Sequence, residues 1–157
     1  MVPFQKIYEE YGKPVYRFLL SLSGEESMAE ELLQETFYQA LQHIDRFEGR
    51  CSLYTWLCRI GKNAWLKECR RRSRFSQTGL DTLTHPDTES QYILRDEYQR
   101  VRQAIRTLEE PYKEVFILHT FGNLKLKEIA LANGKSESWA RVTYFRARQK
   151  IIEEVSK

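Results

Sequence analysis

Apolar side chains recur every three or four residues along most of the chain, and alternating runs of β-branched residues are absent. This spacing is typical of α-helices that bury one face. In the N-terminal half it predicts three helices, over residues 3–21, 27–44 and 52–72. Ser23-Gly24 follows the first of them and favours a break in the helix. The pattern therefore predicts an all-α fold.

A change in composition divides the chain after residue 75. Residues 76–94 are rich in Ser, Thr and Asp, contain Pro86 and carry a net charge of −3. Such a polar stretch is typical of a linker. Helical spacing resumes at Arg95 and continues to the end. We therefore predict two small helical domains, residues 1–75 and 95–157, joined by a flexible acidic linker over 76–94.

The C-terminal part of the chain predicts a helix-turn-helix. A short helix over residues 125–133 leads into Asn133-Gly134, where glycine tolerates the positive φ that a turn often needs. Ser136 or Ser138 can cap the second helix, which should reach about residue 151. Its packed stripe is predicted from small and apolar residues at helical spacing: Ala140, Tyr144, Ala147 and Ile151.

The opposite face of this second helix mixes basic and apolar side chains. It carries Ser138, Arg141, Val142, Phe145 and Gln149, flanked by Arg146 and Arg148. The major groove of DNA admits one α-helix, in which arginine can reach guanine and apolar groups can meet thymine methyls. We favour DNA binding. The alternative is a solvated basic helix with Phe145 tucked against the preceding helix.

A net charge of +3 hides a sharp internal polarity. Residues 1–48 carry a net −5, whereas residues 49–75 carry eight basic side chains against one acidic one, a net +7. Tyr54, Trp56 and Trp65 are interleaved with these cations. Such a segment suits a surface that grips phosphates and stacks on unpaired bases. Trp56 could instead belong to the core, as a lone tryptophan commonly does.

Other classes of protein find little support in the sequence. No apolar run approaches the roughly 20 residues that span a bilayer, and the N-terminus lacks a signal-peptide core, so we expect a cytoplasmic protein without membrane insertion. Cys51, Cys58 and Cys69 lack the short spacing of zinc sites, so we expect free thiols. We also find no catalytic or phosphate-loop motif, and expect no enzyme activity, metal or cofactor.

Four segments carry a family resemblance. AEELLQETFYQAL and FEGRCSLYTWLCRIGKNAWLKECRRR resemble region 2 of bacterial RNA polymerase sigma factors. LEEPYKEVFILHTFGNLKLKEIA and GKSESWARVTYFRARQKI resemble region 4 of the same family. The chain is most similar to the small extracytoplasmic-function group, which keeps only these two regions. Residues 1–75 would then be region 2, and residues 95–157 would be region 4.

The resemblance implies roles for individual residues. Docking on the β′ clamp of core RNA polymerase is implied for Glu31, Leu33, Gln34, Glu35 and Phe37. Recognition of the melted minus-ten element is implied for Arg50, Tyr54, Trp56, Asn63, Lys67, Arg70, Arg71 and Arg72. Recognition of the minus-thirty-five element is implied for Ser138, Trp139, Arg141, Val142, Phe145 and Arg146.

The resemblance also implies partners. They are the β′ clamp and β flap of the polymerase, promoter DNA and an anti-sigma factor. Trp139-Ala140 and Thr143 depart from the pattern common in the family, so promoter preference cannot be copied from a relative.

Two other functions compete with this one. A stand-alone helix-turn-helix regulator would bind duplex DNA without polymerase. A helical interaction protein would use its basic face on RNA or an acidic partner. The row of polar residues on the second predicted helix could likewise be a plain solvated face.

Overall fold

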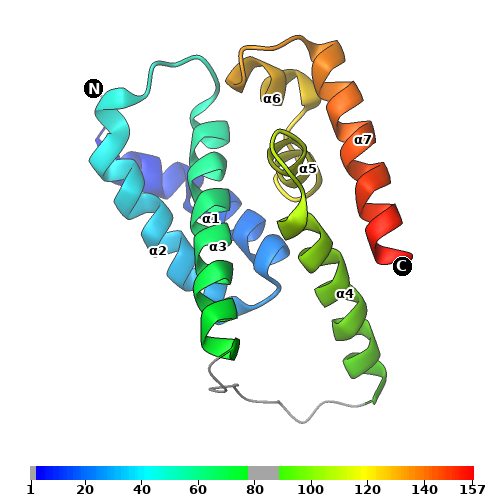
Figure 1. Ribbon diagram of the computed structural model, residues 1–157. Helices are drawn as coiled ribbons and strands as arrows, with labels where there is room; N and C mark the ends of the chain where they lie inside the picture. Colours follow the sequence, from blue (N-terminus) through cyan, green and yellow to red (C-terminus); the bar gives the residue numbers. More distant parts are fainter. Residues whose placement is uncertain (1–2, 78–88) are drawn as a thin grey trace.

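The computed structural model describes residues 3–77 and 89–157, with side chains placed for 3–75 and 97–157 (Figure 1). Within these ranges every regular element is helical, which confirms the all-α prediction. The elements are α1 (Phe4–Ser23), α2 (Glu26–His43), the 3₁₀ turn η1 (Ile44–Arg46), α3 (Leu53–Gln77), α4 (Glu89–Thr107), α5 (Tyr112–Thr120), α6 (Leu126–Ala132) and α7 (Glu137–Val155). Most of the predicted linker lies outside the described residues, and α3 and α4 occupy its two ends.

Helices α1, α2 and α3 pack around one core in the N-terminal half. Val15, Leu19 and Leu57 are fully buried in it, as their helical spacing predicts. Gly61 lets α3 approach closely, because a Cβ there would lie 3.1 Å from Leu19 Cδ2. Trp65 is only 1% exposed, so the prediction that it belongs to a base-stacking surface is wrong. Its large ring is a main filler of this core.

Gly24 ends α1 in the left-handed conformation, with φ of 75°. Its backbone N–H donates to the Leu20 carbonyl oxygen at 2.8 Å, which satisfies one of the free carbonyls at the helix end. The helix therefore runs two residues beyond the predicted end. The break that follows turns the chain into α2.

Helices α4 to α7 build the C-terminal half around Ile105, Val115 and Ile129, which are fully buried. The turn after α6 contains Gly134 with φ of 66°, as the sequence predicts. Ser136 caps α7 by accepting a hydrogen bond from the Trp139 backbone N–H at 3.1 Å. The helix-turn-helix is thus present.

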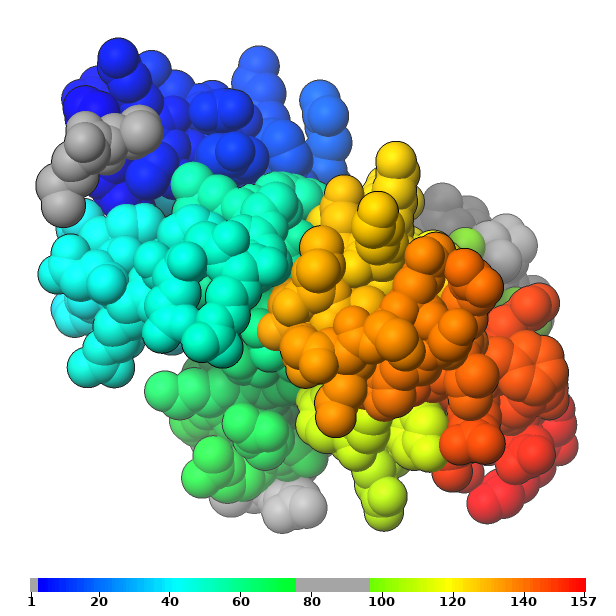
Figure 2. All heavy atoms as spheres, turned by 90° about the horizontal axis from the view of Figure 1, so that it is seen from above, coloured from blue at the N-terminus to red at the C-terminus, as the bar shows by residue number. Residues whose placement is uncertain are grey.

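The two halves lie side by side, with α3 against α5 and α6 (Figures 1 and 2). The sequence does not predict this contact, because it joins residues more than 50 positions apart. Among the helices that the structure describes, none is long and apolar enough to cross a membrane.

Candidate nucleic-acid and protein interfaces

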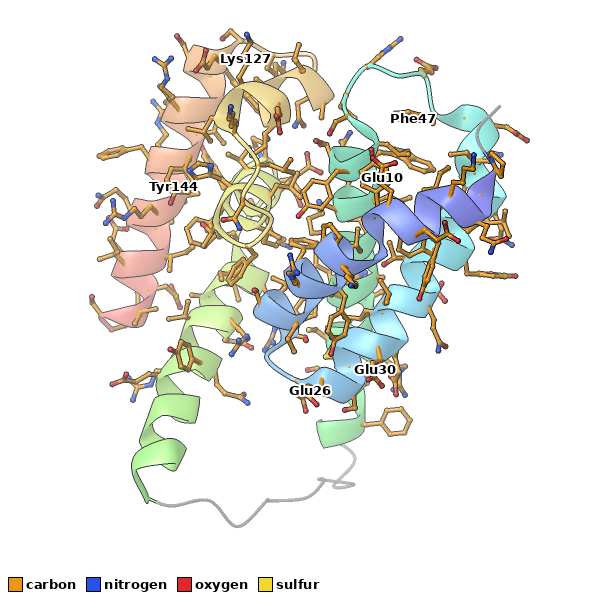
Figure 3. All side chains as sticks on the ribbon, turned by 180° about the vertical axis from the view of Figure 1, so that it is seen from behind. Glu10, Glu26, Glu30, Phe47, Lys127 and Tyr144 are labelled. Carbon is orange, nitrogen blue, oxygen red and sulfur yellow. The ribbon has the colours of Figure 1, made fainter. Side chains whose placement is uncertain are left out.

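Helix α7 presents one face to solvent and buries the other. Ala140, Ala147 and Ile151 are buried, as the predicted stripe requires. Tyr144 is only half-buried, and its ring stacks on Phe116 with centroids 5.7 Å apart (Figure 3). Thr143 is buried as well, which the sequence pattern does not reveal. This packing fixes which side of α7 faces outward.

The outward side of α7 combines apolar and basic groups. Phe145 is 60% exposed and Val142 is 47% exposed. The alternative in which Phe145 tucks against the preceding helix is therefore wrong. Arg141 and Arg146 are exposed beside them, and Arg141 pairs with Glu137 at 3.0 Å. Because this pair is exposed, it contributes little energy, and Arg141 can readily turn to another anion.

The remaining two candidates on α7 lie at its first turn. Ser138 is exposed and Trp139 is half-buried against the core. Trp139 therefore stands at the edge of the outward face, where part of its ring can meet a partner.

Helix α3 carries most of the positive charge of the N-terminal half. Asn63, Lys67 and Arg70 are exposed along it, at intervals of four and three residues. These intervals place the three side chains on one face of the helix. The face offers two cations and one amide to an anionic ligand.

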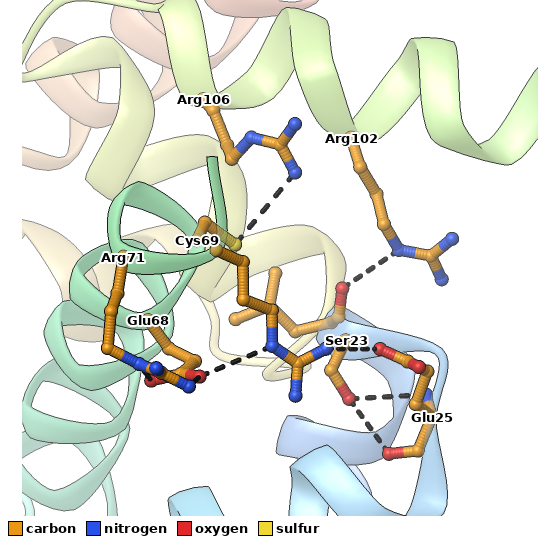
Figure 4. Close-up of polar contacts among 9 residues, drawn as sticks. Ser23, Glu25, Glu68, Cys69, Arg71, Arg102 and Arg106 are labelled. Carbon is orange, nitrogen blue, oxygen red and sulfur yellow. Dashed lines mark hydrogen bonds and ion pairs between the residues drawn. The ribbon is translucent and has the colours of Figure 1, made fainter. Parts of the chain in front are cut away.

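The C-terminal end of α3 is a charged network (Figure 4). Arg71 and Arg72 both donate to Glu68, and Arg72 also reaches Glu25 of the α1–α2 turn at 3.0 Å. The hydrogen bonds from Arg71 and Arg72 outweigh the effect of partial burial and hold the pKa of Glu68 below its usual value. Arg71 also lies over the ring of Phe75.

Three further minus-ten candidates lie near the start of α3. Arg50 is exposed in the preceding loop and pairs with Glu48 at 2.9 Å. Trp56 is half-buried and packs on Phe47, with ring centroids 5.2 Å apart (Figure 3). Tyr54 donates its hydroxyl to the Gly122 carbonyl oxygen in the other half of the molecule. Its ring is therefore engaged within the protein in this conformation.

Helix α2 presents the predicted docking row. Glu31, Gln34 and Glu35 are exposed, and Leu33 is half-buried between them and the core. Phe37 is only 5% exposed, because the rings of Phe4 and Tyr8 cover it. Phe37 is therefore a core residue in this conformation, and the exposed aromatic and apolar groups beside the row are Tyr38 and Leu41.

Three charged residues that are not among the predicted site residues meet between the halves. Arg59 and Lys62 of α3 approach the same carboxylate oxygen of Glu114 on α5, at 3.0 Å and 3.1 Å. Burial alone would raise the pKa of Glu114, but the charges and hydrogen bonds of Lys62 and Arg59 lower it overall. In the sequence, the sign of this cluster is the carboxylate of Glu114 directly before the apolar run VFIL.

The three cysteines are free. Cys58 is buried, whereas Cys51 and Cys69 are half-buried. Burial raises the pKa of the Cys58 thiol to about 12, so this group stays protonated at neutral pH. Among the described residues, no group of three or more His, Cys, Asp and Glu side chains could hold a metal ion.

Taken together, these features define a class of protein. A helix-turn-helix exposes an apolar and basic face, and a separate helical bundle exposes a row of cations and a second, acidic row. Such a molecule is built to engage a nucleic acid and a protein at once.

Comparison with known proteins assigns the family. Residues 7–75 match Sigma-70 region 2, and residues 98–151 match Sigma-70, region 4. The ECF RNA polymerase sigma factor SigX of Bacillus subtilis is 30% identical over 152 residues, which cover 91% of this chain and 78% of the relative. The RNA polymerase sigma factor YlaC of the same organism is 28% identical and covers 98% and 92%. The chain belongs to the extracytoplasmic-function sigma factors of the sigma-70 family, which direct RNA polymerase to promoters.

Solved structures share the fold. The sigma factor RpoE of Bartonella quintana, in complex with the anti-sigma factor NepR, has a TM-score of 0.58 and 23% identity. That match covers 98% of this chain and 96% of the other. CnrH, in complex with the cytosolic domain of CnrY, has the same TM-score and identity and covers 98% and 87%.

Proposed function

We propose that this sigma factor contacts its promoter through two surfaces, the exposed face of α3 and the exposed face of α7. Residues 1–75 act as region 2, and residues 95–157 act as region 4, with the segment between them setting their reach. The matches to regions 2 and 4 fall within these boundaries and support the division.

The α7 face reads the minus-thirty-five element as duplex DNA. The observation that carries this assignment is the exposure of Val142 and Phe145 between Arg141 and Arg146. Exposed apolar groups cost free energy in water, whereas thymine methyls in the major groove would cover them. Ser138 and Trp139 border this surface at the N-terminus of α7.

The α3 face handles the minus-ten element after its strands separate. Asn63 can pair with an unstacked base, while Lys67, Arg70, Arg71 and Arg72 neutralise phosphates. Stacking on an aromatic ring contributes about 1–3 kcal/mol per base. Trp56 and Tyr54 are the candidates for this contact, and Arg50 supplies a further cation from the loop before α3.

The α2 row docks the factor on the β′ clamp of the polymerase in the cytoplasm. Glu31, Gln34 and Glu35 supply the polar contacts, and Leu33 supports them from the edge of the core. Phe37 acts indirectly, by fixing the rings above it. The C-terminal domain contacts the β flap. We further propose control by an anti-sigma factor, since a similar fold is seen in complex with such a partner.

A run-off transcription assay tests the function directly. The full chain is added to core RNA polymerase with genomic fragments, and new transcripts are mapped at their 5′ ends. We expect transcripts that need the chain and share two sequence elements upstream of their starts. A stand-alone regulator would instead protect symmetric half-sites without polymerase. The absence of any transcript that depends on the chain would refute the proposal.

A further inference from the structure

The contact between α3 and α5 is built around one buried carboxylate. Arg59 Nε and Lys62 Nζ lie 3.0 Å and 3.1 Å from Glu114 Oε1. Lys62 is 4% exposed and Glu114 is 6% exposed, so water is nearly excluded from this ion pair. Glu110 approaches Lys62 from the rim at 3.7 Å and is itself half-exposed. We define this cluster of Arg59, Lys62 and Glu114 as the latch.

Further hydrogen bonds surround the latch. Arg59 also donates to the Ala132 carbonyl oxygen at 3.2 Å, and Tyr54 donates to the Gly122 carbonyl oxygen at 3.0 Å. Both acceptors lie in the C-terminal half: Ala132 is the last residue of α6, and Gly122 lies between α5 and α6. In the space-filling view, α6 and the start of α7 lie directly beside the N-terminal part of α3 (Figure 2). Arg59 and Tyr54 are thus occupied by their own chain.

A second contact joins the halves at the far end of α3 (Figure 4). Arg102 of α4 donates to the Leu22 carbonyl oxygen at 2.9 Å, at the end of α1. Arg106 lies 3.8 Å from the Cys69 sulfur. Among the residues whose side chains the structure describes, the closed arrangement is thus held at both ends of α3, and the latch is the contact that buries an ion pair.

Under the proposed function, the two halves have to separate to read a promoter. The minus-ten and minus-thirty-five elements lie about 25 base pairs apart, which is about 85 Å of duplex at ~3.4 Å per base pair. A compact chain of this length has a radius of gyration of about 15 Å. The closed molecule is therefore too short to reach both elements, and the contact between α3 and α5 must break.

The latch has the chemistry of a phosphate contact. A carboxylate and a phosphate carry the same sign of charge and accept the same hydrogen bonds from arginine and lysine. Arg59 and Lys62 also lie on the helix that carries the minus-ten candidates Asn63 and Lys67. An anion from the nucleic acid could replace Glu114 without leaving either cation unpaired, which would be costly.

We propose that Glu114 occupies the place of a DNA phosphate on Arg59 and Lys62, so that the free protein is held closed until nucleic acid displaces it. This proposal rests on the proposed function in assigning α3 and α7 to the two promoter elements. It adds Arg59 and Lys62 to the nucleic-acid surface and gives Glu114 an inhibitory role.

The test measures the distance between the halves in the isolated full chain. A donor and an acceptor dye are attached through unnatural amino acids at Gln42 and Ser156, which are both exposed. Glu114→Gln keeps the shape but removes the charge, and Glu110→Gln is the matched control. We expect lower energy transfer for Glu114→Gln, with the open-to-closed ratio rising about tenfold or more, and little change for Glu110→Gln.

The second measurement uses the same labels and a 12-nucleotide oligothymidine, which supplies phosphates without a promoter sequence. Adding it to the wild-type chain should lower energy transfer, and Glu114→Gln should bind it about tenfold more tightly. Unchanged transfer at saturating oligothymidine would overturn the proposal, whether or not Glu114→Gln folds. Because neither measurement involves polymerase or a promoter, such a failure would leave the proposed transcription function standing.

Discussion

At the scale of single residues, some aromatic side chains are buried and others are exposed, and composition does not distinguish the two. Trp65 fills the N-terminal core, whereas Phe145 stands largely in solvent among arginines. Both lie near basic residues in the sequence. Only the packing of the surrounding helices decides which ring is structural and which is available to a ligand.

Arg141→Ala should weaken recognition of the minus-thirty-five element, because Arg141 lies on the exposed α7 face. Losing one arginine contact to a base is expected to cost about 1–3 kcal/mol. The measurement is a footprint of the upstream element with polymerase bound. Lys150→Ala is the control, since Lys150 lies over Tyr112 on another side of the helix. Equal footprints for both variants would argue against α7 as the reading helix.

At the scale of elements, helical periodicity carries most of what could be predicted. The five predicted helices and the turn at Gly134 are present, because each depends on local spacing or on one residue's backbone preference. Of the two candidate caps, Ser136 and Ser138, it is Ser136 that caps α7. Thr143 and Phe37 were harder to place. Their burial depends on helices far away in the sequence, and a single stripe cannot reveal it.

The exposed row of Glu31, Gln34 and Glu35 on α2 should bind core polymerase. Glu31→Lys combined with Gln34→Ala should reduce affinity for core polymerase about tenfold, because both side chains are exposed on one face. Affinity is measured by pull-down or fluorescence anisotropy. Glu10→Lys on α1 makes the same charge reversal outside the row (Figure 3) and should bind normally. If the double variant kept its full affinity for core polymerase, the polar row of α2 would be an ordinary solvated face.

At the scale of the whole molecule, the sequence predicts two domains but not how they meet. The contact depends on pairs such as Arg59 and Glu114, 55 residues apart, and no local pattern encodes it. The candidate site was therefore predicted as a set of open surfaces. The structure adds that part of α3 is covered by the protein itself.

The closed arrangement of the two halves should be lost at acid pH. The pKa of Glu114 is lowered in the closed form, so ionised Glu114 favours closure above its open-state pKa, about 4.3. This stabilisation is lost as the pH falls through the lower, closed-state pKa. The charged and titratable groups that face Glu114 are Arg59, Lys62, Glu110 and the thiol of Cys51.

Energy transfer between the dyes at Gln42 and Ser156 measures this dependence between pH 7 and about pH 3.5. The wild-type chain and Glu110→Gln should both open near the acid end, with helical circular dichroism showing whether the fold persists. Glu114→Gln should lack the transition. A transition at the same pH in Glu114→Gln would place the titrating group elsewhere.

Gly24 lies where the end of α1 meets the side chain of Arg102 from α4. A Cβ at this position would lie 2.6 Å from Arg102 Nη2, and the backbone there already has a positive φ. Any larger residue would thus strain the stop of the first helix and push the guanidinium of Arg102 out of its present position. The end of the first helix and the arginine that bonds to the Leu22 carbonyl oxygen from the other domain therefore share one position at which only glycine fits without strain.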